Sequence, residues 1–220
     1  MDKIYKEAFE TYIKDFKTQR LPRGFLIKAK TSYIYILLGG IIQYSGVSCK
    51  YIHKRATNSK ILIFDQSLFG NFESNSSVCT DCCYYKCITS VEYVKVSSID
   101  LLNIIKKNQN YLYSLLQRFN QRLIDTENLF NIISHREIKN RLAHFLLLLA
   151  TYYGISLKKG ITINVKISHA TIASILNTTR VTITRLIGNF KKENIIQIQG
   201  RKIIILQPIA LSNFVSLTES

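Results

Sequence analysis

The chain of 220 residues contains no tryptophan and only two prolines, whereas isoleucine, lysine, asparagine and tyrosine are abundant. This bias is typical of AT-rich coding. No apolar run reaches the roughly 18 residues that a membrane-spanning helix needs, so we expect no membrane span. The first ten residues, MDKIYKEAFE, have the pattern of neither a signal peptide nor a Ser/Arg-rich transit peptide. We therefore expect the chain to work in the compartment where it is made.

Acidic residues are scarce as well, because 14 Asp and Glu stand against 30 Lys and Arg, a net charge of +16. Such a charge favours a polyanionic partner, either nucleic acid or an anionic membrane surface. The coding bias accounts for much of the same charge without any partner. The basic residues are spread along the chain, so the charge alone does not locate a site.

The signatures of an enzyme are missing. The four histidines, His53, His135, His144 and His169, do not cluster in the sequence. Neither a nucleophile elbow nor a phosphate-binding loop is present. We therefore expect no enzymatic activity, no catalytic residues, no metal site and no required cofactor.

Four of the five cysteines, Cys79, Cys82, Cys83 and Cys87, lie within nine residues, and Cys49 stands apart. The odd number indicates a reducing compartment rather than a disulfide framework. Small buried or loop residues are the simplest interpretation. The alternatives are a zinc or iron–sulfur site and a reversible disulfide. A redox- or metal-sensing role for the Cys79–Cys87 cluster is therefore kept as the second hypothesis.

The hydrophobic pattern changes twice along the chain. Residues 2–17 have the period of a short helix. From Leu21 to about Val96, short segments rich in β-branched and aromatic residues predict an antiparallel sandwich or barrel. From about Ile99 the period is helical, and a second change at Ser134 marks a domain boundary.

The region after Ile99 carries an apolar stripe with heptad spacing: Leu112, Leu116, Phe119, Leu123, Thr126, Phe130 and Ile133. It fits a helix-pairing seam or a helix packed on its own sheet. A helix of about 27 residues is roughly 40 Å long, which favours a parallel contact between two chains. Ser134 and Glu137 in SHRE have the spacing of a capping box, and the helix that follows should stop at Gly154.

The stretch ISHATIASILNTTRVTITRLIGNF predicts two short helices that cross at a sharp turn. Ser168 and Thr179 are suited to cap the two helices, and Asn177 tolerates the left-handed conformation of the turn. Ile183, Leu186 and Ile187 should face inward, whereas Arg180, Val181, Thr182 and Arg185 should face outward. This is the spacing of a helix-turn-helix whose second helix enters the major groove of DNA, where arginine binds guanine in bidentate fashion.

The next segment, NIIQIQGRKIIILQP, predicts a β-hairpin around QGRK. Arg201 and Lys202 in that turn are placed either to bind phosphates or to be solvated on the surface.

These segments together resemble the Crp/Fnr superfamily of dimeric transcription regulators. Within it they are most similar to the global nitrogen regulators of cyanobacteria and their plastid-encoded relatives in red algae. The resemblance covers about residues 30–215 and is strongest in SHREIKNRLAHFLLLLATYYGI, GITINVKISHATIASILNTTRVTITRLIGNF and KIIILQP. It implies an α+β fold of three parts: a cyclic-nucleotide-binding-type β-barrel (jelly roll) with an N-terminal helix in residues 1–107, a dimerisation helix in 108–134, and a winged helix-turn-helix DNA-binding domain in 135–220.

The resemblance implies that Arg180 and Arg185 read bases. Relatives that read a GTGA half-site carry Glu where Val181 stands, and an apolar residue there suits a GTA…TAC palindrome. The residues expected at the DNA are Ser168, His169, Thr178, Thr179, Arg180, Val181, Thr182, Arg185, Arg201 and Lys202.

In the resembling proteins the effector is 2-oxoglutarate, bound between barrel and dimer helix. The motif RLIDTE implies that Arg122 and Glu127 take part, and these residues flank the apolar seam on opposite sides. In a parallel dimer, Arg122 of one chain would approach Glu127 of its mate; the alternative is two exposed helix charges. The segment LFGNF is similar to the turn whose backbone N–H groups face the effector, or is an ordinary hairpin turn: Phe69, Gly70, Asn71 and Phe72.

The sequence departs from the family at Cys83, where relatives have an arginine. A thiol cannot make the bidentate contact that arginine makes with a carboxylate. Lys86 is the nearby cation that could substitute as a point charge.

The resemblance thus implies a transcription regulator of nitrogen-related genes, an activator, with 2-oxoglutarate as candidate effector. The expected partners are double-stranded DNA, bacterial-type RNA polymerase and a second copy of the chain, with no membrane. The expected location is the plastid (chloroplast stroma) or, alternatively, the cytoplasm of an AT-rich bacterium.

Overall fold

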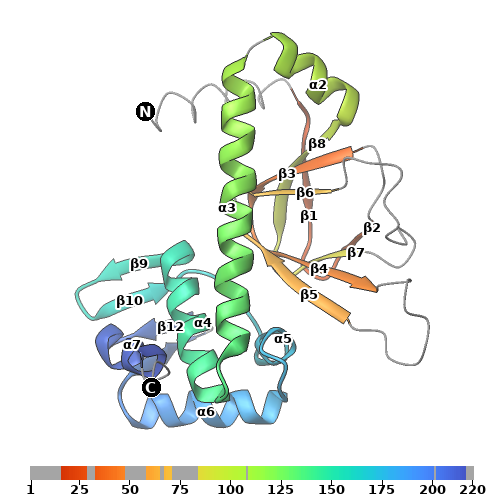
Figure 1. Ribbon diagram of the computed structural model, residues 1–220. Coiled ribbons are helices and arrows are strands. Elements are labelled where there is room, and N and C mark those ends of the chain that lie inside the picture. The colour runs from red at the N-terminus through yellow and green to blue at the C-terminus, as the bar shows by residue number, and fades with distance from the viewer. Residues whose placement is uncertain are drawn as a thin grey trace. The chain divides into compact units, whose positions relative to one another are not determined.

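The computed structural model describes residues 16–28, 33–47, 58–64, 67–70, 84–107, 109–200 and 202–216. The chain divides into two compact units, residues 1–126 and residues 127–220, and Figure 1 labels most of their elements. The helix expected over residues 2–17 lies outside the described residues except for its last two, which are not helical. Within the described part, no helix has the length and apolar character needed to cross a membrane.

In its described residues, the first unit contains two antiparallel sheets of four strands. One sheet has the order β1 (Thr18–Leu21), β8 (Val91–Ser97), β3 (Tyr33–Gly39) and β6 (Leu68–Gly70). The other has the order β2 (Leu26–Lys28), β7 (Tyr84–Cys87), β4 (Ile42–Val47) and β5 (Asn58–Ile63). Apart from the β4–β5 hairpin, successive strands alternate between the sheets, which is the jelly-roll arrangement. The predicted fold class is confirmed, with two facing sheets in place of a closed barrel.

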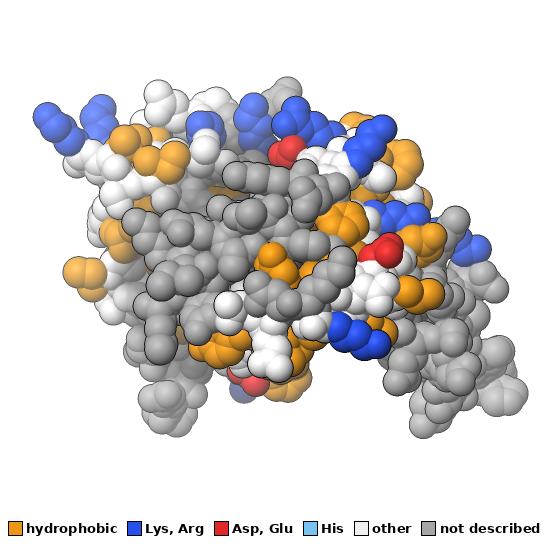
Figure 2. Space-filling model, turned by 90° about the horizontal axis from the view of Figure 1, so that it is seen from above, with side chains coloured by type: hydrophobic (Ala, Val, Ile, Leu, Met, Phe, Trp, Pro, Cys, Tyr) orange, Lys and Arg blue, Asp and Glu red, His pale blue; other side chains and the backbone are white. Residues whose placement is uncertain are grey.

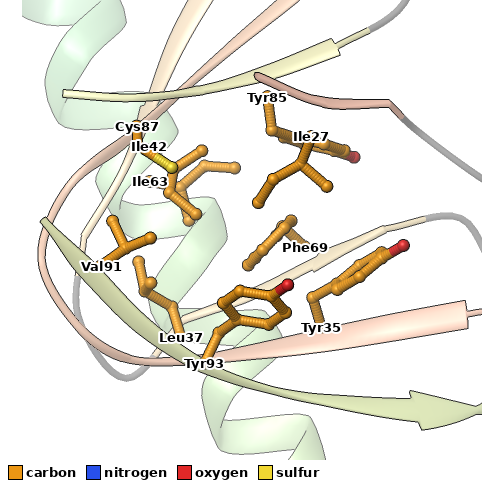
Figure 3. Packing of buried hydrophobic residues seen from close by; sticks show 10 residues of the cluster. All are labelled: Ile27, Tyr35, Leu37, Ile42, Ile63, Phe69, Tyr85, Cys87, Val91 and Tyr93. Atoms are coloured by element: carbon orange, nitrogen blue, oxygen red, sulfur yellow. The ribbon is translucent and has the colours of Figure 1, made fainter. Parts of the chain in front are cut away.

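The core of this unit lies between the two sheets, and both contribute to it (Figure 3). Strand β7 shows how the sequence produces the core: Tyr85 and Cys87 are buried, whereas Tyr84 and Lys86 are exposed, as the period of two requires. Aromatic rings fill the interior. The ring of Phe69 stacks on Tyr35 at 4.9 Å between centroids and contacts Tyr85 at the same separation.

The sheet that contains β3 is buried on its outer face as well. Ile34 and Ile36 of β3 pack with Leu101 of α2 (Ser98–Lys107) and Leu115 of α3 (Gln109–Ser134) in a second apolar cluster. Both faces of β3 are therefore covered, which explains why YIYILL is a continuous apolar run rather than an alternating one.

Helix α3 ends at Ser134, the residue where the sequence pattern changes. The predicted capping box is wrong. The Ser134 hydroxyl donates to the Phe130 carbonyl at 2.8 Å, within the last turn of α3. The next helix, α4 (Ile138–Tyr153), has Glu137 as its N-cap residue and no side-chain cap. Helix α4 stops at Gly154, as expected.

The second unit contains α4 and a sheet of order β11-β12-β10-β9. The elements that follow α4 are β9 (Gly154–Leu157), β10 (Gly160–Ile163), α5 (His169–Ile175), α6 (Arg180–Lys192), β11 (Ile196–Gln199), β12 (Lys202–Ile205) and α7 (Pro208–Ser216). The hairpin β11–β12 confirms the predicted wing. The β9–β10 hairpin and α7 were not predicted from the sequence.

Candidate nucleic-acid interface and effector site

Helix α5 begins directly after Ser168, the residue that the sequence predicts as its cap. The Ser168 hydroxyl accepts a hydrogen bond from the Thr171 N–H at 3.1 Å. One face of the helix is buried through Ile172, Ala173 and Ile175. The small side chain of Ala173 lies on this buried face, as a close crossing of two helices requires.

The turn after α5 is made by a left-handed residue and a second cap. Asn177 has φ of +53°, a conformation that asparagine tolerates better than most residues. The Thr178 N–H donates to the Ala173 carbonyl at 2.9 Å. The Thr179 hydroxyl then accepts from the Thr182 N–H at 3.1 Å and starts α6. The turn and both caps predicted from the sequence are confirmed.

Helix α6 has one buried and one exposed face. Ile183, Leu186 and Ile187 are buried, whereas Arg180 and Arg185 are exposed. Val181 is 78% exposed. Thr182 is half-buried, and its hydroxyl contacts the Thr179 hydroxyl at 2.9 Å. The first turns of α6 therefore offer two guanidinium groups and one apolar side chain to a ligand.

Two of the remaining residues expected at the DNA, His169 and Lys202, contact other side chains of the protein. The Nδ1 atom of His169 contacts the Thr184 hydroxyl at 3.0 Å, which joins the start of α5 to α6. In the wing, Gly200 has φ of +62°, and Lys202 Nζ donates to Asn164 Oδ1 at 2.7 Å. Arg201 lies outside the described residues.

Basic side chains dominate the exposed charges. The face drawn in Figure 2 shows many Lys and Arg side chains and few Asp and Glu side chains, in keeping with the net charge of +16.

The expected effector residues divide between strand β6 and helix α3. Arg122 is half-buried, and its Nη1 donates to the Leu68 carbonyl at 2.8 Å. Glu127 is exposed. Phe69 and Gly70 belong to strand β6 rather than to a turn, and the Phe69 side chain is in the core. Asn71 and Phe72 lie outside the described residues.

The backbone N–H of Gly70 has a partner within the protein, the hydroxyl of Tyr85 at 3.2 Å. Gly70 has φ of +123°, and a Cβ there would lie 2.6 Å from the Tyr33 carbonyl oxygen, so glycine is required. Lys86 is exposed on the face of β7 opposite to Tyr85 and is directed away from the core between the sheets. Cys83 lies outside the described residues.

Sequence reasoning missed two polar groups of this region. Tyr85 contacts Gly70 from the neighbouring sheet, and no pattern in the sequence predicts that contact. Asp125 is only 2% exposed and accepts from Gln121 Nε2 at 3.0 Å. The sequence signal for Asp125 was its position three residues after Arg122, which places the two side chains on the same side of α3.

Among the cysteines, Cys87 is described and the other four are not. Its thiol is fully buried in the core between the sheets, and burial raises its pKa to about 11. A protonated, buried thiol is neither a metal ligand nor a ready nucleophile. For Cys87, the structural interpretation is therefore favoured over the redox or metal interpretation.

A jelly roll, a long helix and a helix-turn-helix followed by a β-hairpin wing define a Crp-type transcription regulator. The model of the Crp-like helix-turn-helix domain matches residues 140–214. The chain is 30% identical over 180 residues to the global nitrogen regulator of Nostoc sp., covering 81% of this chain and 79% of that protein. It is 31% identical over 184 residues to the putative HTH-type transcriptional regulator ycf28 of Porphyra purpurea, covering 82% and 74%.

Solved structures show the same fold. A CooA mutant from Carboxydothermus hydrogenoformans superposes with a TM-score of 0.70 at 18% identity, covering 94% of this chain and 90% of that one. FixK2 from Bradyrhizobium japonicum gives 0.70 at 16% identity, covering 90% and 96%. The chain belongs to the Crp/Fnr family of transcription regulators, and within it is related to the global nitrogen regulators. It is a DNA-binding regulator and not an enzyme.

Proposed function

We propose that the protein activates transcription of nitrogen-related genes as a homodimer that reads a GTA…TAC palindrome. The observation that carries this proposal is the exposed face of α6, where Arg180 and Arg185 flank the apolar side chain of Val181. Arginine recognises guanine through two parallel hydrogen bonds, and an apolar side chain contacts the thymine methyl group. Valine cannot accept from the cytosine amine, so the GTGA half-site of other family members is disfavoured.

The dimer is supported by the apolar stripe on α3. Leu116, Leu123 and Phe130 are 56%, 63% and 65% exposed in the single chain. Apolar side chains gathered along one helix face and open to water are characteristic of a protein interface. A parallel pairing of two α3 helices covers the stripe. A two-fold dimer of this family then reads half-sites about one turn of DNA apart, roughly 34 Å.

As effector we propose 2-oxoglutarate. The bond from Arg122 to the Leu68 carbonyl orients the guanidinium, and its remaining N–H groups are suited to a carboxylate. Lys86 faces away from the core between the sheets, so it is a poor substitute for the arginine that relatives carry where Cys83 stands. We therefore propose a weaker response to the ligand than in a regulator with both arginines.

The proposed partners beyond DNA are a second copy of the chain and bacterial-type RNA polymerase, which an activator must contact. The proposed location is the plastid stroma. The AT-rich composition and the similarity to the ycf28 protein of Porphyra purpurea support it. The cytoplasm of an AT-rich bacterium is the alternative.

The experiment is a titration of a fluorescent GTA…TAC duplex with purified protein, followed by anisotropy with and without 2-oxoglutarate and beside a scrambled duplex. We expect specific binding that the ligand tightens. Specific binding without any ligand effect would reject 2-oxoglutarate and retain the DNA-reading function. Equal binding to both duplexes would reject the palindrome.

A further inference from the structure

The junction between α3 and α4 contains a group of polar contacts that the proposed function does not use. The last two turns of α3, the bend at residues 135–137 and the whole helix-turn-helix belong to one compact unit. The bend is the covalent connection between the helix that carries the apolar stripe and the helices that carry the DNA-contacting residues.

Arg141, one turn into α4, joins the bend to the helix-turn-helix. Its Nε donates to the His135 carbonyl at 2.7 Å, and its Nη1 donates to the Leu176 carbonyl at 3.3 Å. Leu176 is the C-cap residue of α5, directly before Asn177 of the turn. The fixed fork of one guanidinium therefore joins the bend after α3 to the residue that precedes the turn of the helix-turn-helix.

The imidazole of His135 is held in turn by His144. The Nε2 atom of His135 lies 3.1 Å from the Nδ1 atom of His144. The ring centroids are 5.3 Å apart. Two rings in contact through these nitrogens could hardly have their centroids further apart, so the two nitrogens point at each other. This is the geometry of a hydrogen bond and not that of two ligands converging on a metal. It needs one N–H and one unprotonated nitrogen, and two imidazolium rings cannot form it.

We propose that His135, Arg141 and His144 form a clamp that positions the helix-turn-helix on the end of α3 and is required for tight, sequence-specific DNA binding. All three are positioning residues, because none lies on the exposed face of α6. The inference rests on the proposed function for its DNA readout. The clamp itself is open to measurement without DNA.

The clamp has a pH dependence with a defined sign. Burial, and then the neighbouring His135, lower the pKa of His144 below its ordinary value. The folded protein therefore holds His144 neutral, and the clamp is intact above the ordinary histidine pKa of about 6.5. As the pH falls below that value, protonation favours the open or unfolded chain, and the contribution of the clamp is lost.

The charged side chains on the bend, on α4, on the C-terminal end of α6 and on the β9–β10 turn, whose elements pack against α4, are Arg136, Glu137, Lys139, Arg141, Lys191, Lys192, Glu193, Lys158 and Lys159. Helix α7 has no titratable side chain. Lys139 is paired with Glu193 at 3.6 Å. Burial is the main cause of the lowered pKa of His144, and His135 is the neighbouring side chain that adds to it.

The test compares Arg141→Lys with Arg136→Lys, a matched change at an exposed arginine in the bend. Lysine keeps the charge but cannot hold two carbonyls at once. We expect Arg141→Lys to weaken binding to the specific duplex about tenfold, as the loss of one or two charged hydrogen bonds implies, with Arg136→Lys unchanged. Hydrogen exchange without DNA should rise at residues 135–137 and 176–178 in Arg141→Lys alone.

A second variant, His144→Asn, replaces the imidazole with a carboxamide, which can still donate or accept a hydrogen bond but does not titrate. DNA affinity of the unaltered protein should fall between about pH 7 and pH 5.5, and His144→Asn should remove part of that fall. Equal exchange in the two arginine variants, or identical pH profiles for His144→Asn and the unaltered protein, would overturn the clamp. Failure of the unaltered protein to prefer the specific duplex would reject the proposed function, and hydrogen exchange would still decide the clamp.

Discussion

Arg122 Nη1 donates a 2.8 Å hydrogen bond to the backbone carbonyl of Leu68, the first residue of β6. The contact joins α3 to the strand that also contains Phe69 and Gly70. Since a guanidinium has five N–H donors in a rigid fork, one bond to Leu68 orients the group and leaves donors for a carboxylate. The helix that carries the apolar stripe is thereby connected to the proposed effector site.

Replacing Arg122 with lysine should remove the response to 2-oxoglutarate. An ammonium on a flexible stem cannot keep the Leu68 contact and bind a carboxylate in bidentate fashion at the same time. The measurement is the ratio of DNA dissociation constants with and without the ligand, beside Arg23→Lys at an exposed turn. A response in Arg122→Lys equal to that of the unaltered protein would contradict this role.

The helix-turn-helix was predictable residue by residue because its determinants are local. Caps at Ser168 and Thr179 act within three residues, and Asn177 makes the turn by its own backbone conformation. The capping box failed for a local reason too. The Ser134 hydroxyl took the Phe130 carbonyl of its own helix, a competing bond that serine at a helix end commonly makes.

The contacts of the candidate effector site and of the clamp depend on tertiary structure, so they cannot be predicted from the sequence pattern. Gly70 meets Tyr85 across two sheets, and Arg141 reaches Leu176 only once α5 has packed. Strand β9 was missed because its four residues are all exposed and show no alternation. By contrast, the outward direction of Lys86 follows from strand alternation alone, which the sequence does contain.

Changing Val181 to glutamate should shift the preferred half-site from GTA to GTGA. A carboxylate at this exposed position can accept from the cytosine amine, and relatives that read GTGA carry glutamate there. We expect discrimination to change by about 1–3 kcal/mol, the value of one good base contact. Competition between the two labelled duplexes measures this change. An unchanged preference would show that residue 181 does not take part in base reading.

Charging the stripe on α3 should produce a monomer. Leu123 is 63% exposed on the stripe, and Ile99 is 72% exposed on α2, outside it. We expect Leu123→Glu to dissociate the dimer in sedimentation velocity, because a paired seam would bury two uncompensated carboxylates. Ile99→Glu should leave the dimer intact. Identical sedimentation of the two variants would place the interface elsewhere.

The left-handed residue of the turn gives a stability test. Asn177→Ala should lower the free energy of unfolding by about 1 kcal/mol, because alanine resists φ of +53°. Asn177→Gly should cost little, since glycine adopts this conformation freely. Asn189→Ala, at an exposed position of α6, controls for loss of the amide. Denaturant unfolding measures all three, and equal costs for alanine and glycine would show that the turn is not strained.

The most direct test of the central claim, that the exposed face of α6 reads DNA, is the affinity of Arg180→Ala for the GTA…TAC duplex. Arg23→Ala removes the same charge at an exposed position of the other unit. We predict that Arg180→Ala loses roughly tenfold or more in specific affinity and approaches the affinity for scrambled DNA, while Arg23→Ala retains its preference. Equal losses in the two variants at every salt concentration would contradict the account, because the arginine would then contribute charge and no base reading.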